Sequence, residues 1–290
     1  MIAVGIEYRR RPSALGYMTL ALWPKRGLLP GAGFPRLEAR WRGLRASPRE
    51  RREFAELCGP PPGEGLPLLL LHTLAFRLQM ALLTQPAFPL PIWRVLQVRN
   101  RLARRREFSP DATLDLKAEV AASRVLEKGL EVDLRCSASE RGDLVWEATN
   151  TFYVRGRFGA AVAPSPFAAV PAVDGGEESR WRMASGGGLR FGALSGDYNG
   201  IHLSDRYARL LGFARAFAHP QRVLGQCLAH LGGALPSGML RLDAWLKGPV
   251  AYDAEVRLRT ARRADETVFA LAVPPEERPA IVARLYCGAA

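Results

Sequence analysis

Several residue types that would identify common classes of protein are scarce in this sequence of 290 residues. The four cysteines form no CxxC pair and no Cys/His pair at metal-site spacing, because they lie far apart at Cys58, Cys136, Cys227 and Cys287. The sequence therefore indicates neither a zinc site nor a disulfide framework. We expect reduced cysteines, packed mostly as small apolar side chains.

Lysine is nearly absent among the basic residues. The formal net charge is +13, yet arginine supplies all but four of the 41 basic side chains and is scattered through every segment. This bias is more typical of a GC-rich coding sequence than of a nucleic-acid surface, so we expect no nucleic-acid partner. The positive surplus still favours a polyanionic ligand, such as a phosphorylated cofactor or an acidic carrier protein.

A uniform apolar run of membrane-spanning length is also missing. The most apolar run, residues 66–83, contains His72 and Arg77, which predict a buried helix and not a membrane span. The N-terminus has Glu7 followed by an arginine run, and it lacks the apolar core of a signal peptide. We therefore expect a soluble, cytoplasmic protein with no membrane partner.

What the sequence does contain is one series of elements that occurs twice. In the first half, alternating residues predict strands at 2–6 and 37–41, and Ser47 with Pro48 predicts the start of a charged helix. After a break at 59–63, a buried helix is expected over 67–84. Strand patterns then follow at 93–101, 113–126, 130–137 and 144–154.

The second half repeats this plan after a segment rich in Gly, Ala and Pro. A short strand is expected at 189–194, and Ser204 caps a small helix over 205–211. A longer helix over 221–231 ends at Gly232-Gly233. Strand patterns then follow at 240–246, 256–262, 267–273 and 280–286. We predict an α+β protein with two domains, 1–160 and 181–290, joined by a linker over 161–180.

One stretch in the second half concentrates polar chemistry: Ser195-Gly196-Asp197-Tyr198-Asn199-Gly200-Ile201-His202. A carboxylate and an imidazole that hold one water can polarise it for attack, and the same pair can return a proton to the product carbon. Hydration of this kind needs no metal and no bound cofactor. The helix after His219 offers unpaired N–H groups and the positive end of its dipole to a developing oxyanion.

Each of these residues also has a simpler interpretation. Asp197 and Asn199 suit a turn, since Gly-Asp-x-Asn-Gly is good turn chemistry, and His219 suits a helix cap as well as a site. His202 at the right spacing favours catalysis. The two histidines inside predicted helices, His72 and His230, are interpreted as packing or surface residues.

The stretch, followed by Ala208, Gly212-Phe213 and Ala218-His219, resembles the hydratase motif of the MaoC-like family of R-specific enoyl-thioester hydratases and dehydratases. The likeness covers residues 191–258. It implies a tandem, or double, hotdog fold, in which an antiparallel sheet wraps round a central helix in each half. The first half has no Asp-x-Asn motif, so it would be a degenerate domain that forms a wall of the substrate pocket.

The resemblance also implies roles for individual residues. Asp197 and His202 would be the catalytic pair that adds water to a trans-2-enoyl thioester, giving an (R)-3-hydroxyacyl product, or that removes it. Asn199 would anchor the loop or the water. Ser195 and Gly196 would support the loop. The residues that face the thioester oxygen would be His219, Gln221 and Arg222.

The implied substrate is an acyl thioester of coenzyme A, or of acyl carrier protein, as in fatty acid metabolism. Its acyl chain could be branched, bulky or dicarboxylic, and no metal or cofactor is required. Gly200 replaces the family proline, and Pro220, which has no N–H, replaces a family glycine. A non-catalytic subunit that binds acyl thioesters is therefore the alternative, and both a monomer and a homodimer are open.

Overall fold

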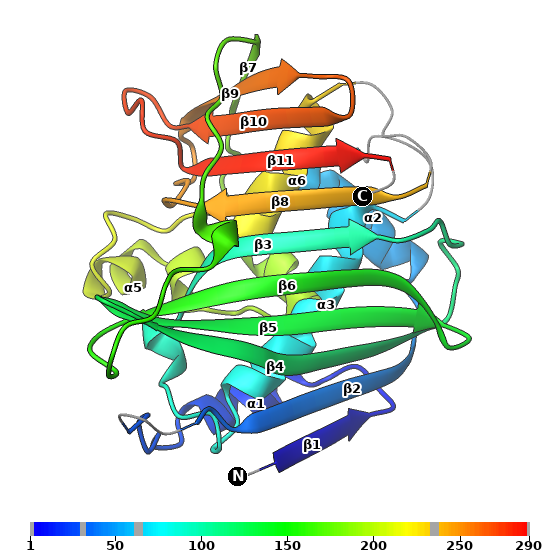
Figure 1. Cartoon of the computed structure of the whole chain (residues 1–290). Coiled ribbons are helices and arrows are strands. Elements are labelled where there is room, and N and C mark those ends of the chain that lie inside the picture. Colours follow the sequence, from blue (N-terminus) through cyan, green and yellow to red (C-terminus); the bar gives the residue numbers. More distant parts are fainter. Residues whose placement is uncertain (1–2, 30–32, 61–65, 233–237, 289–290) are drawn as a thin grey trace.

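The computed structural model describes residues 3–29, 33–60, 66–232 and 238–288. Figure 1 shows strands and helices from one face. The N-terminal half contributes the strands β1 (Ala3–Tyr8), β2 (Arg36–Leu44), β3 (Leu96–Arg104), β4 (Leu114–Leu126), β5 (Gly129–Glu140) and β6 (Asp143–Arg155). The C-terminal half contributes β7 (Glu177–Arg182), β8 (Leu240–Leu246), β9 (Glu255–Arg262), β10 (Glu266–Ala272) and β11 (Ile281–Cys287).

The helices lie between these strands. The α-helices are α1 (Ala14–Ala21), α2 (Pro48–Cys58), α3 (Leu68–Leu83), α4 (Gly188–Ser195), α5 (Asp205–Leu210) and α6 (Pro220–His230). Short 3₁₀ turns form η1 (Ile92–Arg94), η2 (Pro166–Ala168) and η3 (Gly200–His202). Helix α2 begins as expected, since Ser47 and Glu50 form a capping box and Pro48 is its first residue.

All the strands of the described residues join one 11-stranded sheet in the order β1-β2-β4-β5-β6-β3-β8-β11-β10-β9-β7. Both halves have the same strand order. In the first half β2 and β3 are separated by β4, β5 and β6, and in the second half β7 and β8 are separated by β9, β10 and β11. In each half helices connect the two separated strands in sequence. The second strands β3 and β8 pair antiparallel, from Arg99 opposite Trp245 to Arg104 opposite Leu240. This repeated order is the double hotdog, as predicted. Strand β1 is an addition that pairs parallel to β2 at the sheet edge.

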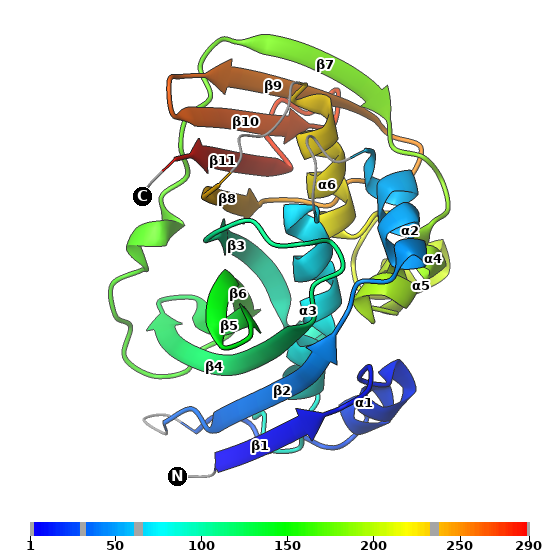
Figure 2. The same ribbon diagram turned by 90° about the vertical axis from the view of Figure 1, so that its right-hand side faces the viewer.

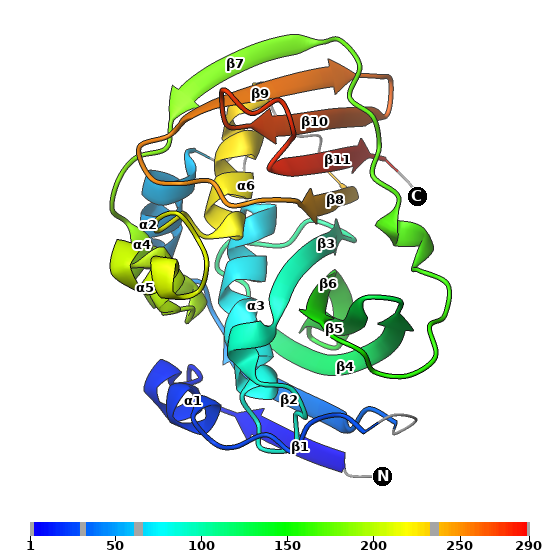
Figure 3. The same ribbon diagram turned by 90° about the vertical axis from the view of Figure 1, so that its left-hand side faces the viewer.

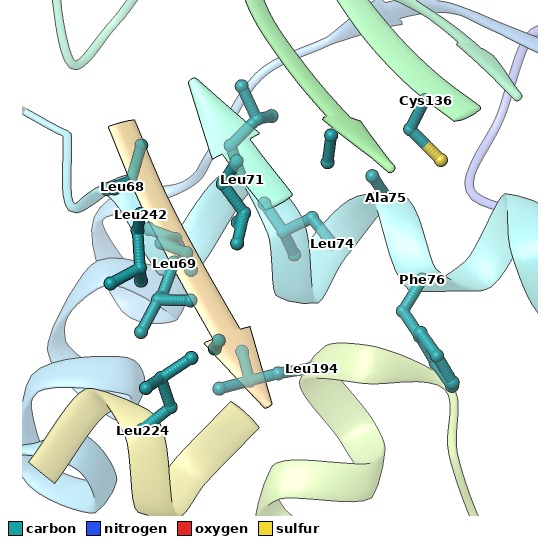
Figure 4. Packing of buried hydrophobic residues seen from close by; sticks show 14 of the residues in the cluster. Leu68, Leu69, Leu71, Leu74, Ala75, Phe76, Cys136, Leu194, Leu224 and Leu242 are labelled. Carbon is teal, nitrogen blue, oxygen red and sulfur yellow. The ribbon is translucent and has the colours of Figure 1, made fainter. Parts of the chain in front are cut away.

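The helix α3 forms the centre of the core. Every residue of α3 except Met80 is buried. In Figure 4 its leucines face Leu194 of α4, Leu224 of α6 and Leu242 of β8, so one core is built from both halves. None of the described helices is both long and apolar enough to cross a membrane.

Residues 156–176 connect the halves across the face of the sheet that α3 and α6 leave uncovered (Figures 2 and 3). There Trp245 of β8 donates its indole N–H to the Phe167 carbonyl at 2.9 Å, and the guanidinium of Arg101 in β3 lies 4.2 Å from the centre of the Phe167 ring. A cavity of about 270 Å³ lies between residues 170–173 and the outward side chains of β9 and β10. The connecting segment is therefore packed on both strands that join the halves.

Some local expectations differ from the structure. The predicted strand at 189–194 is the helix α4, because Gly188, Phe191, Leu194 and Ser195 share one buried face at helical spacing and glycines in the left-handed conformation flank it. Strand β7 begins at Glu177, inside the expected linker, because it pairs with β9 at the sheet edge. Helix α1 was not expected. Part of the break at 59–63, and Gly233, lie outside the described residues.

Candidate active site

The polar stretch forms a loop that is fixed by its own hydrogen bonds. After α4, the Ser195 hydroxyl accepts from the Asp197 N–H at 3.1 Å, and an Asp197 carboxylate oxygen accepts from the Asn199 N–H at 3.1 Å. The Asn199 side chain then accepts from the Ile201 N–H at 3.3 Å and caps η3, which ends at His202. Each short polar side chain thus bonds the backbone two residues on, which is why this sequence forms consecutive turns.

These turns bring the predicted pair together. Asp197 Oδ2 lies 3.7 Å from His202 Nε2, and the His202 side chain is 4% exposed. His202 Nδ1 lies 2.9 Å from the Phe217 carbonyl oxygen. Because a carbonyl can only accept, Nδ1 carries the ring proton and leaves the Nε2 lone pair facing the carboxylate.

The charge state of His202 follows from its surroundings. Burial lowers the pKa of His202, while the Asp197 carboxylate and the Phe217 carbonyl oppose that shift. A neutral ring places two hydrogen-bond acceptors, Nε2 and Oδ2, 3.7 Å apart with no hydrogen between them. A single water can donate one hydrogen to each of them, so the pair is suited to hold and polarise a water molecule.

His219 supports this pair from the start of α6. Its Nε2 lies 3.0 Å from the Asp197 carbonyl oxygen, so it donates to the backbone of the catalytic candidate. The His219 ring is stacked on His202 with 3.9 Å between ring centres. Burial, and next the neighbouring His202, lower the pKa of His219 well below its ordinary value. His219 is therefore neutral, and its action on Asp197 passes through the main chain.

Asp197, His202 and His219 also form a cluster that could in principle hold a metal ion, since their ligand atoms lie within 4.8 Å of one another. A histidine ligand, however, binds a metal in the plane of its ring at about 2 Å. The two rings are stacked with planes only 27° apart, so their free nitrogens do not point to one position. This geometry does not fit a shared metal.

The residues at the start of α6, which were predicted to face a thioester oxygen, differ in whether their backbone N–H is free to donate. Pro220 has no N–H, and the Arg222 N–H already donates to the His219 carbonyl at 2.9 Å. No described residue accepts from the Gln221 N–H, while the Gln221 side chain donates to Gln97 at 2.9 Å. The Arg222 guanidinium bonds the carbonyls of Leu57, Gly186 and Ala184, so it ties α6 to α2 and to the residues before α4.

The structure explains locally why position 200 is a glycine where the motif it resembles has a proline. A Cβ added to Gly200 would lie 2.6 Å from a ring carbon of Tyr207 in α5. The Tyr207 ring therefore takes the space that a proline ring would fill in this loop.

Three residues near the site were not predicted. Phe217 was missed because only its carbonyl takes part, and a carbonyl has no sequence signature. Tyr17 and Arg77 contact the loop from the N-terminal half, more than a hundred positions away in sequence. The one available signal was Arg77 itself, a charged residue inside an otherwise apolar helix.

Known proteins were compared with this chain in sequence and in fold. No family model matches the chain. The 3-hydroxyacyl-thioester dehydratase X of Mycobacterium tuberculosis is 24% identical over 218 residues, covering 75% of this chain and 78% of the relative. Its crystal structure gives a TM-score of 0.72 at 22% identity, over 86% of this chain and 98% of that one. The chain is thus similar to a 3-hydroxyacyl-thioester dehydratase over about three quarters of its length.

Other structures show the same fold at lower identity. A MaoC-like dehydratase from Phytophthora capsici superimposes with a TM-score of 0.68 at 16% identity, covering 89% of this chain and 96% of the other. A double-hotdog protein from Mycobacterium tuberculosis gives 0.55 at 14% identity, over 92% and 96% of the two chains. The double hotdog therefore extends over both halves of this chain.

Proposed function

We propose that this protein is a lyase that adds water to a trans-2-enoyl thioester, or removes it from the 3-hydroxyacyl thioester. The observation that carries the proposal is the pair of acceptors 3.7 Å apart, Asp197 Oδ2 and His202 Nε2, with His202 held as the Nδ1–H tautomer. The names of its relatives, a 3-hydroxyacyl-thioester dehydratase and a MaoC-like dehydratase, support the same class of reaction.

In the hydration direction, the pair takes a proton from water and later passes it to the substrate. A water held between Asp197 and His202 gives one proton to the pair as its oxygen bonds to C3 and the C2–C3 π bond breaks. The resulting negative charge moves to the thioester oxygen, which we place at the Gln221 N–H and the positive end of the α6 dipole. The proton on the pair then passes to C2. Because hydration does not change the overall oxidation state of the substrate, the reaction requires no redox cofactor.

The proposal extends to the carrier of the acyl chain and to the stereochemistry of the product. We expect a coenzyme A thioester and an (R)-3-hydroxyacyl product, with acyl carrier protein as the other possible carrier; the net charge of +13 suits both anionic carriers. The N-terminal half, without an Asp-x-Asn motif, would form a wall of the pocket. The four free cysteines favour the cytoplasm as the compartment.

A row of amides, all buried except the half-buried Gln97, supports a particular kind of acyl chain. From Gln221 the row continues through Gln97 to Asn100, and Asn150, opposite Asn100 in the sheet, bonds Gln79 of α3. Within the described structure Asn100 Nδ2 and Asn150 Oδ1 have no partner, whereas Gln79 also interacts with the Cys136 thiol. Unpaired buried amides favour a chain that carries a neutral hydrogen-bonding group over a dicarboxylic chain, whose charge they would not neutralise.

The experiment is a panel of trans-2-enoyl-CoA thioesters with straight, branched, hydroxyl-bearing and dicarboxylic chains. We expect hydration by the unaltered protein, and a fall in kcat/KM of about 10²- to 10⁴-fold in Asp197→Asn with thioester binding retained. The matched control is Asp205→Asn, because Asp205 also accepts a backbone N–H, from Ala216 at 2.8 Å, but lies outside the pair. Binding without turnover across the whole panel would favour the non-catalytic subunit.

A further inference from the structure

The carbonyl groups at the end of α4 are held by side chains of the N-terminal half. Arg77 of α3 donates its Nε–H to the Leu194 carbonyl at 3.2 Å and an Nη2–H to the Ala193 carbonyl at 2.5 Å. Tyr17 of α1 donates its hydroxyl to the Gly196 carbonyl at 2.6 Å. The next carbonyl in the chain, that of Asp197, accepts from His219. Three of these four carbonyls are thus held across the two halves.

The Arg77 side chain is unusual in its burial. It is only 4% exposed, and no carboxylate of the described residues pairs with it. Its charge is met by carbonyls, including the Pro12 carbonyl just before α1 at 3.1 Å. A buried cation is costly unless it is well bonded, but the end of a helix is the negative end of its dipole. The position of Arg77 at the end of α4 therefore offsets the cost of its burial.

Gly196 makes this approach possible. It has a left-handed φ of 80° and ends α4. A Cβ added there would lie 2.0 Å from the Tyr17 hydroxyl oxygen and 2.8 Å from the Arg77 Cγ. The glycine next to Asp197 is therefore required both by the backbone turn and by the two side chains that reach it.

We propose that Tyr17 and Arg77 are positioning residues, which hold the Asp197 loop in register with His202 from the opposite half of the molecule. This inference rests on the proposed hydration, since it concerns the same pair. Among the described residues the hydrogen bonds of both side chains go to backbone carbonyls, and for Tyr17 the Asp197 charge adds to burial in raising its pKa. Both side chains therefore act mainly on the backbone that carries Asp197. A shift of about 1 Å at such a position can cost about 10²-fold in rate.

The test compares two substitutions that each remove one hydroxyl. Tyr17→Phe keeps the ring and loses the bond to Gly196, whereas Tyr153→Phe loses a bond of the same kind and length, to the Lys128 carbonyl at 2.6 Å, at a hairpin away from the site. We expect Tyr17→Phe to lower kcat about 10- to 100-fold with KM within about twofold. Arg77→Lys keeps the charge but not the fork of donors, and it should lower kcat in the same way. Tyr153→Phe should leave kcat unchanged.

A second readout does not depend on turnover. Amide hydrogen exchange of the peptide covering residues 193–203 should rise in Tyr17→Phe and Arg77→Lys and stay unaltered in Tyr153→Phe. Exchange that is equal in all three variants, or a kcat for Tyr17→Phe equal to that of Tyr153→Phe, overturns the positioning role. Absence of hydration by the unaltered protein would instead contradict the proposed function, while the exchange data would still decide whether the loop is held from the N-terminal half.

Discussion

The two halves share a strand order but differ in where their histidines lie. In the C-terminal half His202 ends a loop of consecutive turns, with one nitrogen on a carbonyl and the other facing Asp197. In the N-terminal half His72 lies inside α3, fully buried beside Trp146, and neither of its nitrogens has a partner among the described residues. The same fold thus carries one imidazole that faces a carboxylate and one that is only packed.

The comparison is tested most directly by making the same substitution in both halves. We expect His202→Leu to lower kcat/KM for hydration by about 10²- to 10⁴-fold, because the acceptor for the proton of water is lost. His72→Leu should keep kcat within about twofold, since the side chain does not reach the site. Steady-state kinetics on one enoyl-CoA substrate decides this, with thermal melting to show that both variants fold. A large loss of kcat in His72→Leu would contradict the assignment.

The buried His72 should make the protein less stable in acid. Burial lowers the pKa of His72 to about 3. Below about pH 6.5 the unfolded chain binds a proton at this residue and the folded chain does not, so stability present above pH 6.5 is lost as the pH falls toward 3. The loss from His72 is about 1.4 kcal/mol per pH unit. His72→Leu should therefore weaken the fall in the free energy of unfolding between pH 6.5 and 4.5 by about 2–3 kcal/mol, as measured by urea titration.

The C-terminal half supplies the control for this experiment. His202 and His219 also have lowered pKa values, so the His72→Leu variant should keep part of its acid sensitivity. Parallel pH curves for the unaltered protein and His72→Leu would show that His72 is protonated in the folded state, contrary to its burial.

The smallest expected effect concerns the loop itself. Because the Tyr207 ring occupies the space beside Gly200, Gly200→Pro should lower stability by about 1–3 kcal/mol through overpacking. Tyr207→Ala should restore most of that loss when the two changes are combined. A double-mutant cycle from urea titration measures this coupling, and additive effects would show that the ring and residue 200 do not compete for space.

The sequence predicted the features that depend on local pattern. The helix at 67–84, the later strands and the capped start of α2 follow from apolar spacing and cap residues, and the structure confirms them with shifts of a few residues. The loop around Asp197 and His202 was also readable, because its turns are made by neighbouring side chains. The catalytic roles of these residues stay a prediction until the variants are measured.

Other features depend on partners that are distant in sequence. Residues 189–194 carry too few apolar positions to distinguish a short strand from a short helix, and packing against α3 decides for α4. Strand β7 has four charged residues, Ser179 and Trp181, with no alternating apolar pattern, and its pairing with β9 makes it a strand. The bonds from Tyr17 and Arg77 join residues 179 and 117 positions apart, which no local pattern encodes.

The segment over residues 156–176, which crosses the sheet with Phe167 packed at the joint between β3 and β8, has a consequence for symmetry. In a dimer of two identical hotdog subunits every substitution occurs twice, so a site and the surface that supports it cannot change independently. A covalent connection removes that constraint. One copy can lose its acidic loop and gain a buried arginine, while the other keeps the loop that this arginine holds.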